Sequence, residues 1–333
     1  MLPPFQQGGT VQMPAPASTF AADVDGLYYF IFWVSVFFFV LITGLLGFAV
    51  IKWRRRTEDQ PAASTNTHNT VLEVTWTVIP LVLVMIMFVW GWKGALNMTV
   101  APGDCLQYQA TAKQWGWAVF HPGATQPSYD PKTGRPVFYV PAGRNVKIVT
   151  RSDDVLHGLA FPAFRVKRDV LPGRYQSLWF RVPEEYIGQT FEFFCHAYCG
   201  KGHSEMWGEV RVISQADYDK SPRPWETEPS DPKELGEMVY KANCFICHTI
   251  DGTPRVGPSF KGLYGRTERE VFLGVGGPLA KVTVDDEYIK ESVRNPNAKI
   301  AKETPQGGMA PWPEQLVTEK QLAGVIEYLK TLK

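Results

Sequence analysis

The chain has 333 residues, a net charge of +1 and a hydrophobic content of 45%. This length allows two or three domains, and the near-neutral charge excludes the basic field that nucleic-acid binding needs. Four of the five cysteines form two close pairs, and Cys105 stands alone. Cysteine pairs beside histidines are more typical of metal or cofactor sites than of a disulfide framework.

Two long apolar runs follow an uncharged beginning. Residues 1–26 contain no Lys or Arg, so they lack the basic start of a secretory signal peptide and are predicted to be an N-terminal tail. Residues 27–51 carry no charge, and residues 71–92 carry only Glu73. Because about 20 apolar residues span a bilayer as a helix, we expect a transmembrane hairpin over 27–92. A buried core helix is the alternative for the first run, but such helices seldom stay uncharged for so long.

The charges between the runs orient this hairpin. Lys52 and Arg54–Arg56 follow the first run directly, whereas the N-terminal tail has no cation. Lys and Arg gather in cytoplasmic loops, and Trp gathers at the membrane surfaces. Both termini are therefore expected outside the cytoplasm, on the periplasmic side of a bacterial inner membrane. Four tryptophans mark the ends of the spans: Trp53, Trp76, Trp90 and Trp92.

The remainder divides into a β-rich part, a linker and a helical part. Short strands separated by Gly, Pro, Asp and Asn over 98–213 predict an antiparallel sandwich or barrel. Residues 214–232 are rich in Pro, Ser and acidic residues and are predicted to be a linker. Residues 233–333 are predicted to be a small all-α domain. The predicted strands are 106–112, 137–140, 145–150, 177–182, 190–194 and 208–212.

A C-x-x-C-H motif begins the helical part. Cys244 and Cys247 can reach the two vinyl groups of one porphyrin, and His248 then faces the iron, so the motif predicts covalent haem c. Met309 is the one methionine after His248, and no histidine follows, so Met309 is the candidate sixth ligand. A redox-active C-x-x-C and half of a zinc site are the alternatives, although the first expects a thioredoxin-like context that is absent.

A second group of soft ligands lies at the end of the β-rich part. Cys195, Cys199, His203 and Met206 follow one another at C-x3-C-x3-H-x2-M, and His157 is expected upstream, in a loop after the strand at 145–150. One Cys with these partners would make a mononuclear blue-copper site. Two thiolates can instead bridge two coppers, with each histidine capping one and Met206 as a weak axial ligand. A Cys195–Cys199 disulfide and a Cys2His2 zinc site are the alternatives, and neither uses Met206.

These motifs resemble two known families. Residues 27–213 resemble subunit II of haem–copper cytochrome c oxidases in VLEVTWTVIP, KQWGWAVF, DDVLHGLAFPAFRVKRDVLPGR and FFCHAYCGKGHSEMWG. Residues 233–333 resemble class I cytochromes c in CFICH, GPSFKGLYGR and Met309. The resemblance implies a two-helix hairpin, a cupredoxin-like domain with a dinuclear CuA centre, and a fused cytochrome c domain as in caa-type oxidases.

The resemblance assigns further roles. It implies that the carbonyl group of Ala197 binds copper, that Pro258 supports His248 through its carbonyl group, and that electrons enter through Trp115. It implies a proton-path role for Glu73, which could equally be an interfacial carboxylate reaching water. The family usually has Glu at position 197, where it helps hold magnesium. Ala197 puts that magnesium site in doubt. His196 is more simply interpreted as a surface or interface residue than as a substitute for the missing carboxylate.

The expected function is that of the subunit through which electrons enter a terminal oxidase. Electrons would pass from haem c to CuA and on to a haem–copper subunit I, so this chain would be a relay without its own oxygen site. The expected partners are subunit I, subunit III, membrane lipid, and a periplasmic cytochrome c or other donor, without nucleic acid. A CuA-type nitric oxide reductase subunit and a free-standing membrane electron carrier are the alternatives.

Overall fold

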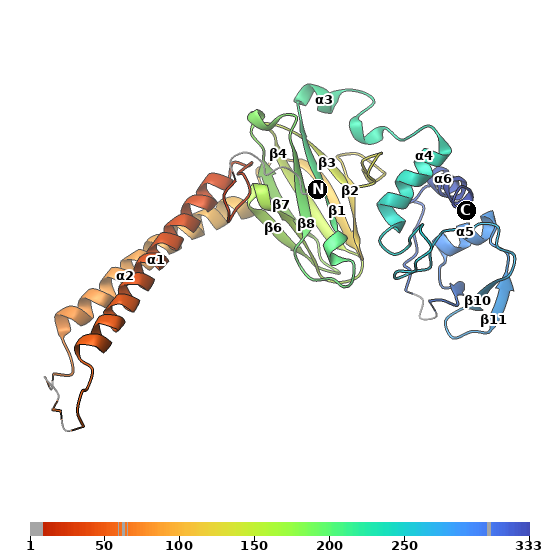
Figure 1. The fold of residues 1–333 in the computed structure, drawn as a ribbon. Helices are drawn as coiled ribbons and strands as arrows, with labels where there is room; N and C mark the ends of the chain where they lie inside the picture. The colour runs from red at the N-terminus through yellow and green to blue at the C-terminus, as the bar shows by residue number, and fades with distance from the viewer. Residues whose placement is uncertain (1–8, 59, 62–63, 65, 305–307) are drawn as a thin grey trace. The chain divides into compact units, whose positions relative to one another are not determined.

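The computed structural model describes all residues except 1–8, 59, 62–63, 65 and 305–307 (Figure 1). Parts of the predicted tail and cytoplasmic loop, and Gly307 before the methionine, therefore lie outside the described residues. The chain separates into two compact units. One is the segment Thr19–Ala101, and the other joins residues 9–18 to Pro102–Lys333.

The segment Thr19–Ala101 is a helical hairpin. Helices α1 (Ala21–Lys52) and α2 (Thr70–Thr99) extend beyond the two apolar runs at both ends. The start of α1 packs on the end of α2, where the Phe30 and Trp90 rings lie 6.0 Å apart and Gly26 admits the Trp90 ring. The helices are therefore antiparallel, as predicted.

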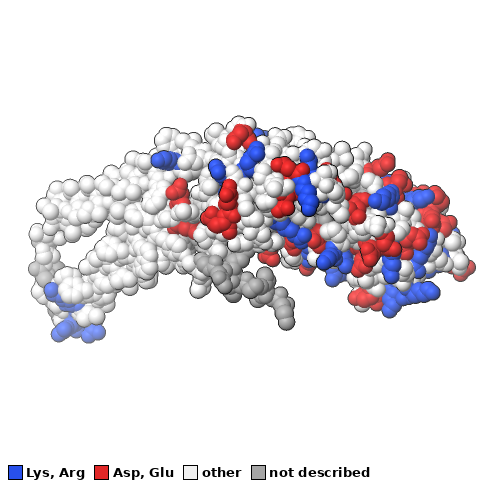
Figure 2. All heavy atoms as spheres, turned by 90° about the horizontal axis from the view of Figure 1, so that it is seen from above, with Lys and Arg blue, Asp and Glu red and all other residues white. Residues whose placement is uncertain are grey.

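The surface of this hairpin suits lipid. Both helices are long and apolar enough to span a membrane, and the described protein does not bury their apolar segments. Figure 2 shows them almost free of charge, with basic side chains at the end of the hairpin where the two helices are connected. Lys52 ends α1, and Arg54–Arg56 follow it in the connecting loop. An apolar helix left uncovered would be unstable in water, so the hairpin anchors the chain in a membrane.

The β-rich part is a sandwich of two curled sheets. One sheet has the order β2-β1-β4-β7 and the other the order β3-β9-β8-β5-β6. Most pairs are antiparallel as predicted, but β1–β4 and β3–β9 are parallel, which strand spacing could not indicate. The strands are β1 (Leu106–Lys113), β2 (Gly116–Phe120), β3 (Val137–Pro141), β4 (Asn145–Ser152), β5 (His157–Phe161), β6 (Val166–Val170), β7 (Gln176–Arg181), β8 (Thr190–Cys195) and β9 (Trp207–Ile213).

Aromatic rings from both sheets fill the space between them. Phe138, Phe161, Phe180 and Phe193 are at most 1% exposed, the Phe161 ring lies 5.3–5.9 Å from the other three, and the Phe138 and Phe193 rings lie 5.2 Å apart. Alternating side chains along each strand supply this core, as on the inner faces of other sandwiches. The core fixes the strand register and thereby the residues at the strand ends.

Residues before the hairpin pack on the β domain after it. The backbone of Ala17 donates to the carbonyl oxygen of Ala163 at 2.8 Å, and the Ser18 hydroxyl donates to Phe164 at 2.7 Å. The Tyr186 hydroxyl donates to Pro16 at 2.6 Å. The two segments that flank the hairpin thus belong to one body, which agrees with the expectation that both emerge on one side of the membrane.

The last part of the chain is built on two crossing helices. Helix α4 (Pro232–Val239) packs on α6 (Glu319–Lys330), and Thr318 caps α6 through its side chain. The core joins Leu235 and Met238 to Leu322, Val325 and Leu329. Helix α5 (Asp286–Arg294) and a small sheet of β10 (Arg269–Leu273), β11 (Leu279–Val282) and β12 (Lys299–Ala301) complete it. The helical architecture was predicted, whereas this sheet was not.

The predicted linker contains short helices. Helix α3 (Gln215–Asp219) buries Tyr218, and the 3₁₀ turn η4 (Pro224–Glu226) carries Trp225. The Trp225 ring stacks on His121 of the β domain at 4.1 Å and 5°. The linker is therefore held against the β domain along part of its length.

Candidate copper and haem sites

Three neighbouring strands of one sheet bring the soft ligands together. Strand β5 begins at His157, and β8 ends at Cys195, with Leu159 paired to Cys195. The loop from 196 to 206 joins β8 to β9 and carries the remaining candidates. His157 is thus the first residue of a strand, whereas the sequence had suggested that it lies in a loop.

The sulfur and nitrogen atoms of the site converge. The Sγ atoms of Cys195 and Cys199 lie 3.9 Å apart. Nδ1 of His157 lies 3.9 Å from Cys195 Sγ, and Nδ1 of His203 lies 3.5 Å from Cys199 Sγ. Each thiol thus has its own histidine. The Met206 sulfur lies 3.9 Å from Cys199, and the Ala197 carbonyl oxygen lies 3.2 Å from Cys195.

Asp154 fixes the orientation of His157. Its Oδ1 accepts a hydrogen bond from His157 Nε2 at 2.8 Å, and its Oδ2 accepts one from the Gln114 backbone at 2.7 Å. With Nε2 protonated, Nδ1 keeps its lone pair and faces the two sulfurs. Carboxylates commonly orient metal-binding histidines in this way. From the sequence, Asp154 could equally have been a turn residue.

Trp115 and Gln114 hold the copper loop from outside. Trp115 Nε1 donates to the Cys199 carbonyl oxygen at 3.0 Å, and Gln114 Nε2 donates to the same oxygen at 2.7 Å. An added Cβ on Gly202 would approach the Trp115 ring within 2.8 Å. Trp115 is therefore in direct contact with the loop, and Gln114 was not indicated by the sequence.

The thiols sit in different electrostatic surroundings. Burial and the neighbouring Cys195 raise the pKa of Cys199 to about 12. Although burial opposes it, hydrogen bonding to His157 and to the backbone lowers the pKa of Cys195. Two thiolates together need a cationic partner, because each negative charge disfavours the other. A metal cation supplies that charge, so the donor set fits a thiolate-bound metal.

The structure also bears on the alternatives for this site. His157, Cys195 and Cys199 place one ligand atom each within 4.8 Å of one another, and all three are buried. The Cys195 and Cys199 Sγ atoms lie 3.9 Å apart, which is too far for a disulfide bond. Met206, 1% exposed, lies among these ligands. A disulfide would not use the methionine, and zinc in a Cys2His2 site would leave it without a role.

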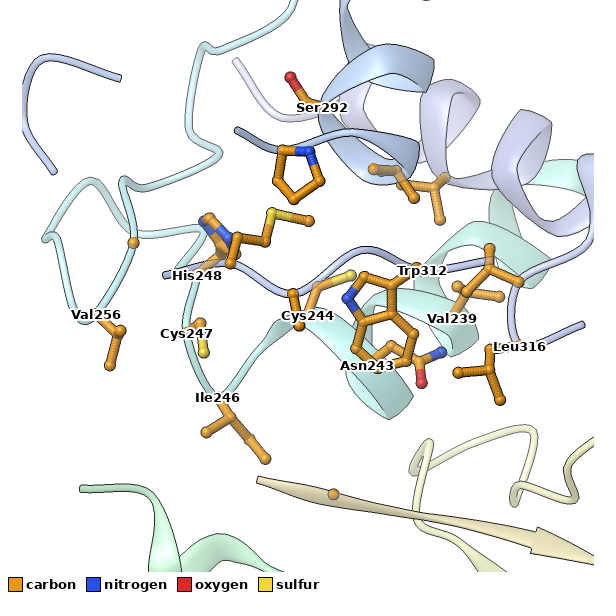
Figure 3. Close-up of a pocket in the computed structure, with 18 of the residues that line it drawn as sticks. Val239, Asn243, Cys244, Ile246, Cys247, His248, Val256, Ser292, Trp312 and Leu316 are labelled. Carbon is orange, nitrogen blue, oxygen red and sulfur yellow. The ribbon is translucent and has the colours of Figure 1, made fainter. Parts of the chain in front are cut away.

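The C-x-x-C-H motif begins in a distorted helical turn. Helix α4 ends in the π-helical turn Tyr240–Cys244, and Cys247 and His248 then follow on a bend stabilised by the backbone bond from His248 to Cys244 at 2.9 Å. π-turns inside helices are frequent at functional sites. Figure 3 shows Cys244, Cys247 and His248 at the wall of one cavity, with Trp312 also lining it.

His248 is prepared as a neutral ligand. Its Nδ1 donates to the carbonyl oxygen of Pro258 at 2.8 Å, which leaves the lone pair on Nε2. Burial lowers the pKa of His248, so the imidazole is uncharged at neutral pH. The Phe260 ring stacks on it at 4.4 Å. A Cβ at Gly257 would overlap the imidazole, so a close approach of backbone to ring requires this glycine.

The cavity contains a buried arginine, two of whose side-chain nitrogens have no hydrogen-bond partner among the described residues. Arg269 lines it and is 6% exposed, yet among the described residues its Nε and Nη1 bond to nothing. Buried donors are nearly always paired, so a group that brings carboxylates fits here, as a porphyrin with propionates does. Met309 lines the same cavity as His248. No motif in the sequence pointed to Arg269.

Two residues with open roles have local structural partners. The Glu73 carboxylate accepts from the backbone of Asn69 at 3.0 Å and so helps cap α2. This contact explains Glu73 without a proton path. His196 lies 3.4 Å from the Asp169 carboxylate and rests over Gly158, where a Cβ would overlap its ring. His196 is thus tied to β6 and β5 of its own domain.

Comparison with known proteins agrees with this arrangement. Residues 6–93 match the transmembrane domain of cytochrome c oxidase subunit II, and residues 133–213 match its periplasmic domain. Residues 231–329 match the family described as cytochrome c oxidase, cbb3-type, subunit III. The chain belongs to the cytochrome c oxidase subunit II family. It carries a cytochrome c domain in addition, and a caa-type fusion fits.

Individual relatives carry the same name. Cytochrome c oxidase subunit 2 of Alkalihalophilus pseudofirmus is 28% identical over 88% of this chain and 82% of that protein. The subunit 2 of Cereibacter sphaeroides is 29% identical over 64% of this chain and 79% of that protein. The solved periplasmic domain of subunit II from Bradyrhizobium japonicum is 28% identical over 36% of this chain and 91% of that domain, with a TM-score of 0.31. The subunit II domains imply copper, and the cytochrome domain implies haem c.

Proposed function

We propose that this subunit II receives electrons at haem c and passes them through a dinuclear copper centre to a haem–copper oxidase subunit. The observation that carries the proposal is the presence, on one chain, of two separate ligand sets: the thiol–imidazole pairs of the β domain and the C-x-x-C-H cavity of the helical domain. The matched families unite these parts in cytochrome c oxidases, so a nitric oxide reductase subunit or a free carrier is not favoured.

The copper ligands follow from the convergence of donors. Cys195 and Cys199 would bridge two coppers, and His157 and His203 would each bind one. Met206 and the carbonyl group of Ala197 would complete the ligand set. Bridging thiolates delocalise charge over both metals, which lets the centre exchange one electron with little rearrangement. Ala197 serves this role through its backbone alone, and no carboxylate is present there for a magnesium ion.

The haem ligands follow from the cavity. Cys244 and Cys247 would carry the thioether bonds, His248 would be the proximal ligand, and Met309 would be the sixth ligand. A Met/His pair raises the potential of haem iron. The Pro258 carbonyl group orients His248, and Arg269 would pair with a propionate. These residues would hold the group, and none of them would react during the transfer of an electron.

The setting follows from the hairpin. The anchored chain would place both redox domains on the periplasmic side of a bacterial inner membrane, where subunit I takes the electron and a periplasmic donor supplies it. Trp115 touches the copper loop and lines the haem cavity, so it is the proposed point of electron entrance to copper. We also propose that Glu73, besides capping α2, lies near the proton path of the partner subunit.

Metal analysis and spectroscopy of the detergent-solubilised full chain test this proposal. We expect two coppers and one covalent haem for each chain, with the mixed-valence spectrum of a copper pair. One copper for each haem, or zinc in its place, would contradict the dinuclear centre. Purification from the native membrane should recover a larger haem-bearing subunit together with this chain. Recovery of the chain alone under mild detergent would favour the free-standing carrier.

A further inference from the structure

The loop before β3 places an arginine between the two ligand sets. The guanidinium carbon of Arg135 lies 3.9 Å from the Trp207 ring centroid and 5.5 Å from the Phe245 ring centroid. Trp207 directly follows Met206, and Phe245 directly follows Cys244. Arg135 therefore joins the residue beside a copper-ligand candidate to the residue beside a haem-attachment cysteine.

The copper domain holds this guanidinium in place. Arg135 Nη1 donates to the carbonyl oxygen of Glu205 at 3.3 Å. The backbone on either side is fixed as well, because the carbonyl group of Arg135 accepts from the backbone of Asp130 at 2.8 Å. A planar guanidinium stacks on aromatic faces in a way that an ammonium group does not. The position thus suits arginine and not lysine.

Neighbouring contacts press the haem motif onto the same surface. The Tyr129 hydroxyl donates to Asn243 Oδ1 at 3.2 Å. A Cβ on Gly202 would come within 2.9 Å of Ile246 Cγ2, so Ile246, between the two haem cysteines, lies directly on the copper loop. Residues 243, 245 and 246 thus meet the copper domain at three points, and Arg135 holds the central one.

We propose that Arg135 is a positioning residue for electron transfer from haem c to copper: it holds Phe245 against Trp207 and so creates a contact between the two centres that is separate from Trp115. The inference rests on the proposed function. One electron leaves the haem iron and reduces the copper pair by one electron, and no bond is made and no proton moves. From Met206 to Cys244 the route is covalent except at the two faces of Arg135.

The test uses the solubilised full chain loaded with haem and copper. A flash-excited ruthenium complex reduces the haem, and haem reoxidation reports transfer to copper. We expect R135Q to slow this step at least tenfold and R135K to slow it by a smaller factor, with the spectra and potentials of both centres unchanged. R181Q is the matched control, because Arg181 is exposed and lies on β7, at the sheet edge opposite β2. It should transfer at the normal rate.

Hydrogen–deuterium exchange of the metal-free chain gives an independent readout. In R135Q, peptides covering 240–248 should exchange faster than in the unsubstituted chain, while R181Q should leave them unchanged. Transfer within twofold of normal in R135Q, unchanged exchange, or an altered copper spectrum would each overturn the role of Arg135. If the unsubstituted chain itself passed no electron from haem to copper, the proposed function would fail instead.

Discussion

A single carboxylate decides which nitrogen of His157 is available to a metal. Because Asp154 accepts from Nε2 at 2.8 Å, Nδ1 is left as the ligand atom. Asp154→Asn keeps the shape but can present an N–H group to the same nitrogen and favour the wrong tautomer. We expect copper affinity to fall about 10- to 100-fold, measured by competition with a chelator. Asp153→Asn is the control, since Asp153 pairs with Arg151 at 3.2 Å and should leave the affinity unchanged.

Asp130 links acid stability to one buried ion pair. Its carboxylate accepts from Arg211 Nη2 at 2.6 Å and from the Thr133 backbone at 2.7 Å, and these bonds outweigh burial and lower its pKa. Since the folded pKa lies below the unfolded one, the stabilisation is present above about pH 4 and is lost as the pH falls through the folded pKa.

Asp130→Asn should therefore lower the free energy of unfolding by about 2 kcal/mol at neutral pH. The difference from the unsubstituted chain should shrink as the pH falls below about 4, because the native carboxylate is then protonated as well. Denaturant unfolding of the solubilised chain at several pH values measures this. A difference that stays constant down to about pH 2 would show that Asp130 acts through shape and not charge.

At the scale of elements, the close crossing of α4 and α6 depends on two glycines. A Cβ at Gly236 would overlap the Gly324 carbonyl group and lie 2.9 Å from Tyr328 Cβ. Gly236→Ala should force the helices apart and destabilise the cytochrome domain by about 1–3 kcal/mol, the usual cost of overpacking. Denaturation followed by the haem absorbance measures it. Gly94→Ala in α2, where a Cβ meets nothing within 4 Å, should leave the midpoint unchanged.

Sequence patterns predict these elements unevenly. The two spans and six strands were predicted from apolar runs bounded by turn residues. These strands are β1, β3, β4, β7, β8 and β9. Strand β5 was missed because it begins at His157, within a segment that looks like a loop. The sheet β10–β12 was missed because its strands are three to five residues long and partly charged. The candidate ligands can be identified from their spacing, whereas the contacts of Asp154, Arg269 and Arg135 are created only by the fold.

At the scale of the whole molecule, the linker determines how freely the haem domain moves relative to the copper domain. Trp225 stacks on His121 at 4.1 Å, and its ring lies 4.9 Å from Tyr218. Burial, together with the charge of Arg223, lowers the pKa of His121 to about 3, so the stack stays uncharged at physiological pH. With Trp225 docked, the tether to α4 is residues 226–231. If α3 also detached after the loss of Trp225, the tether could lengthen to 214–231.

This threefold longer tether should lower the effective concentration of the haem domain at the copper domain. Effective concentration falls roughly as the −3/2 power of tether length, so Trp225→Ala should slow flash-induced haem-to-copper transfer up to about fivefold. Trypsin should also cut faster after Lys220, which precedes Ser221. Trp225→Phe keeps an aromatic face and should restore both properties in large part. If Trp225→Ala changed neither the rate nor the cleavage, the direct contacts between the two domains, such as those around Arg135 and Ile246, would hold the domains together, and the linker would serve only as a connection.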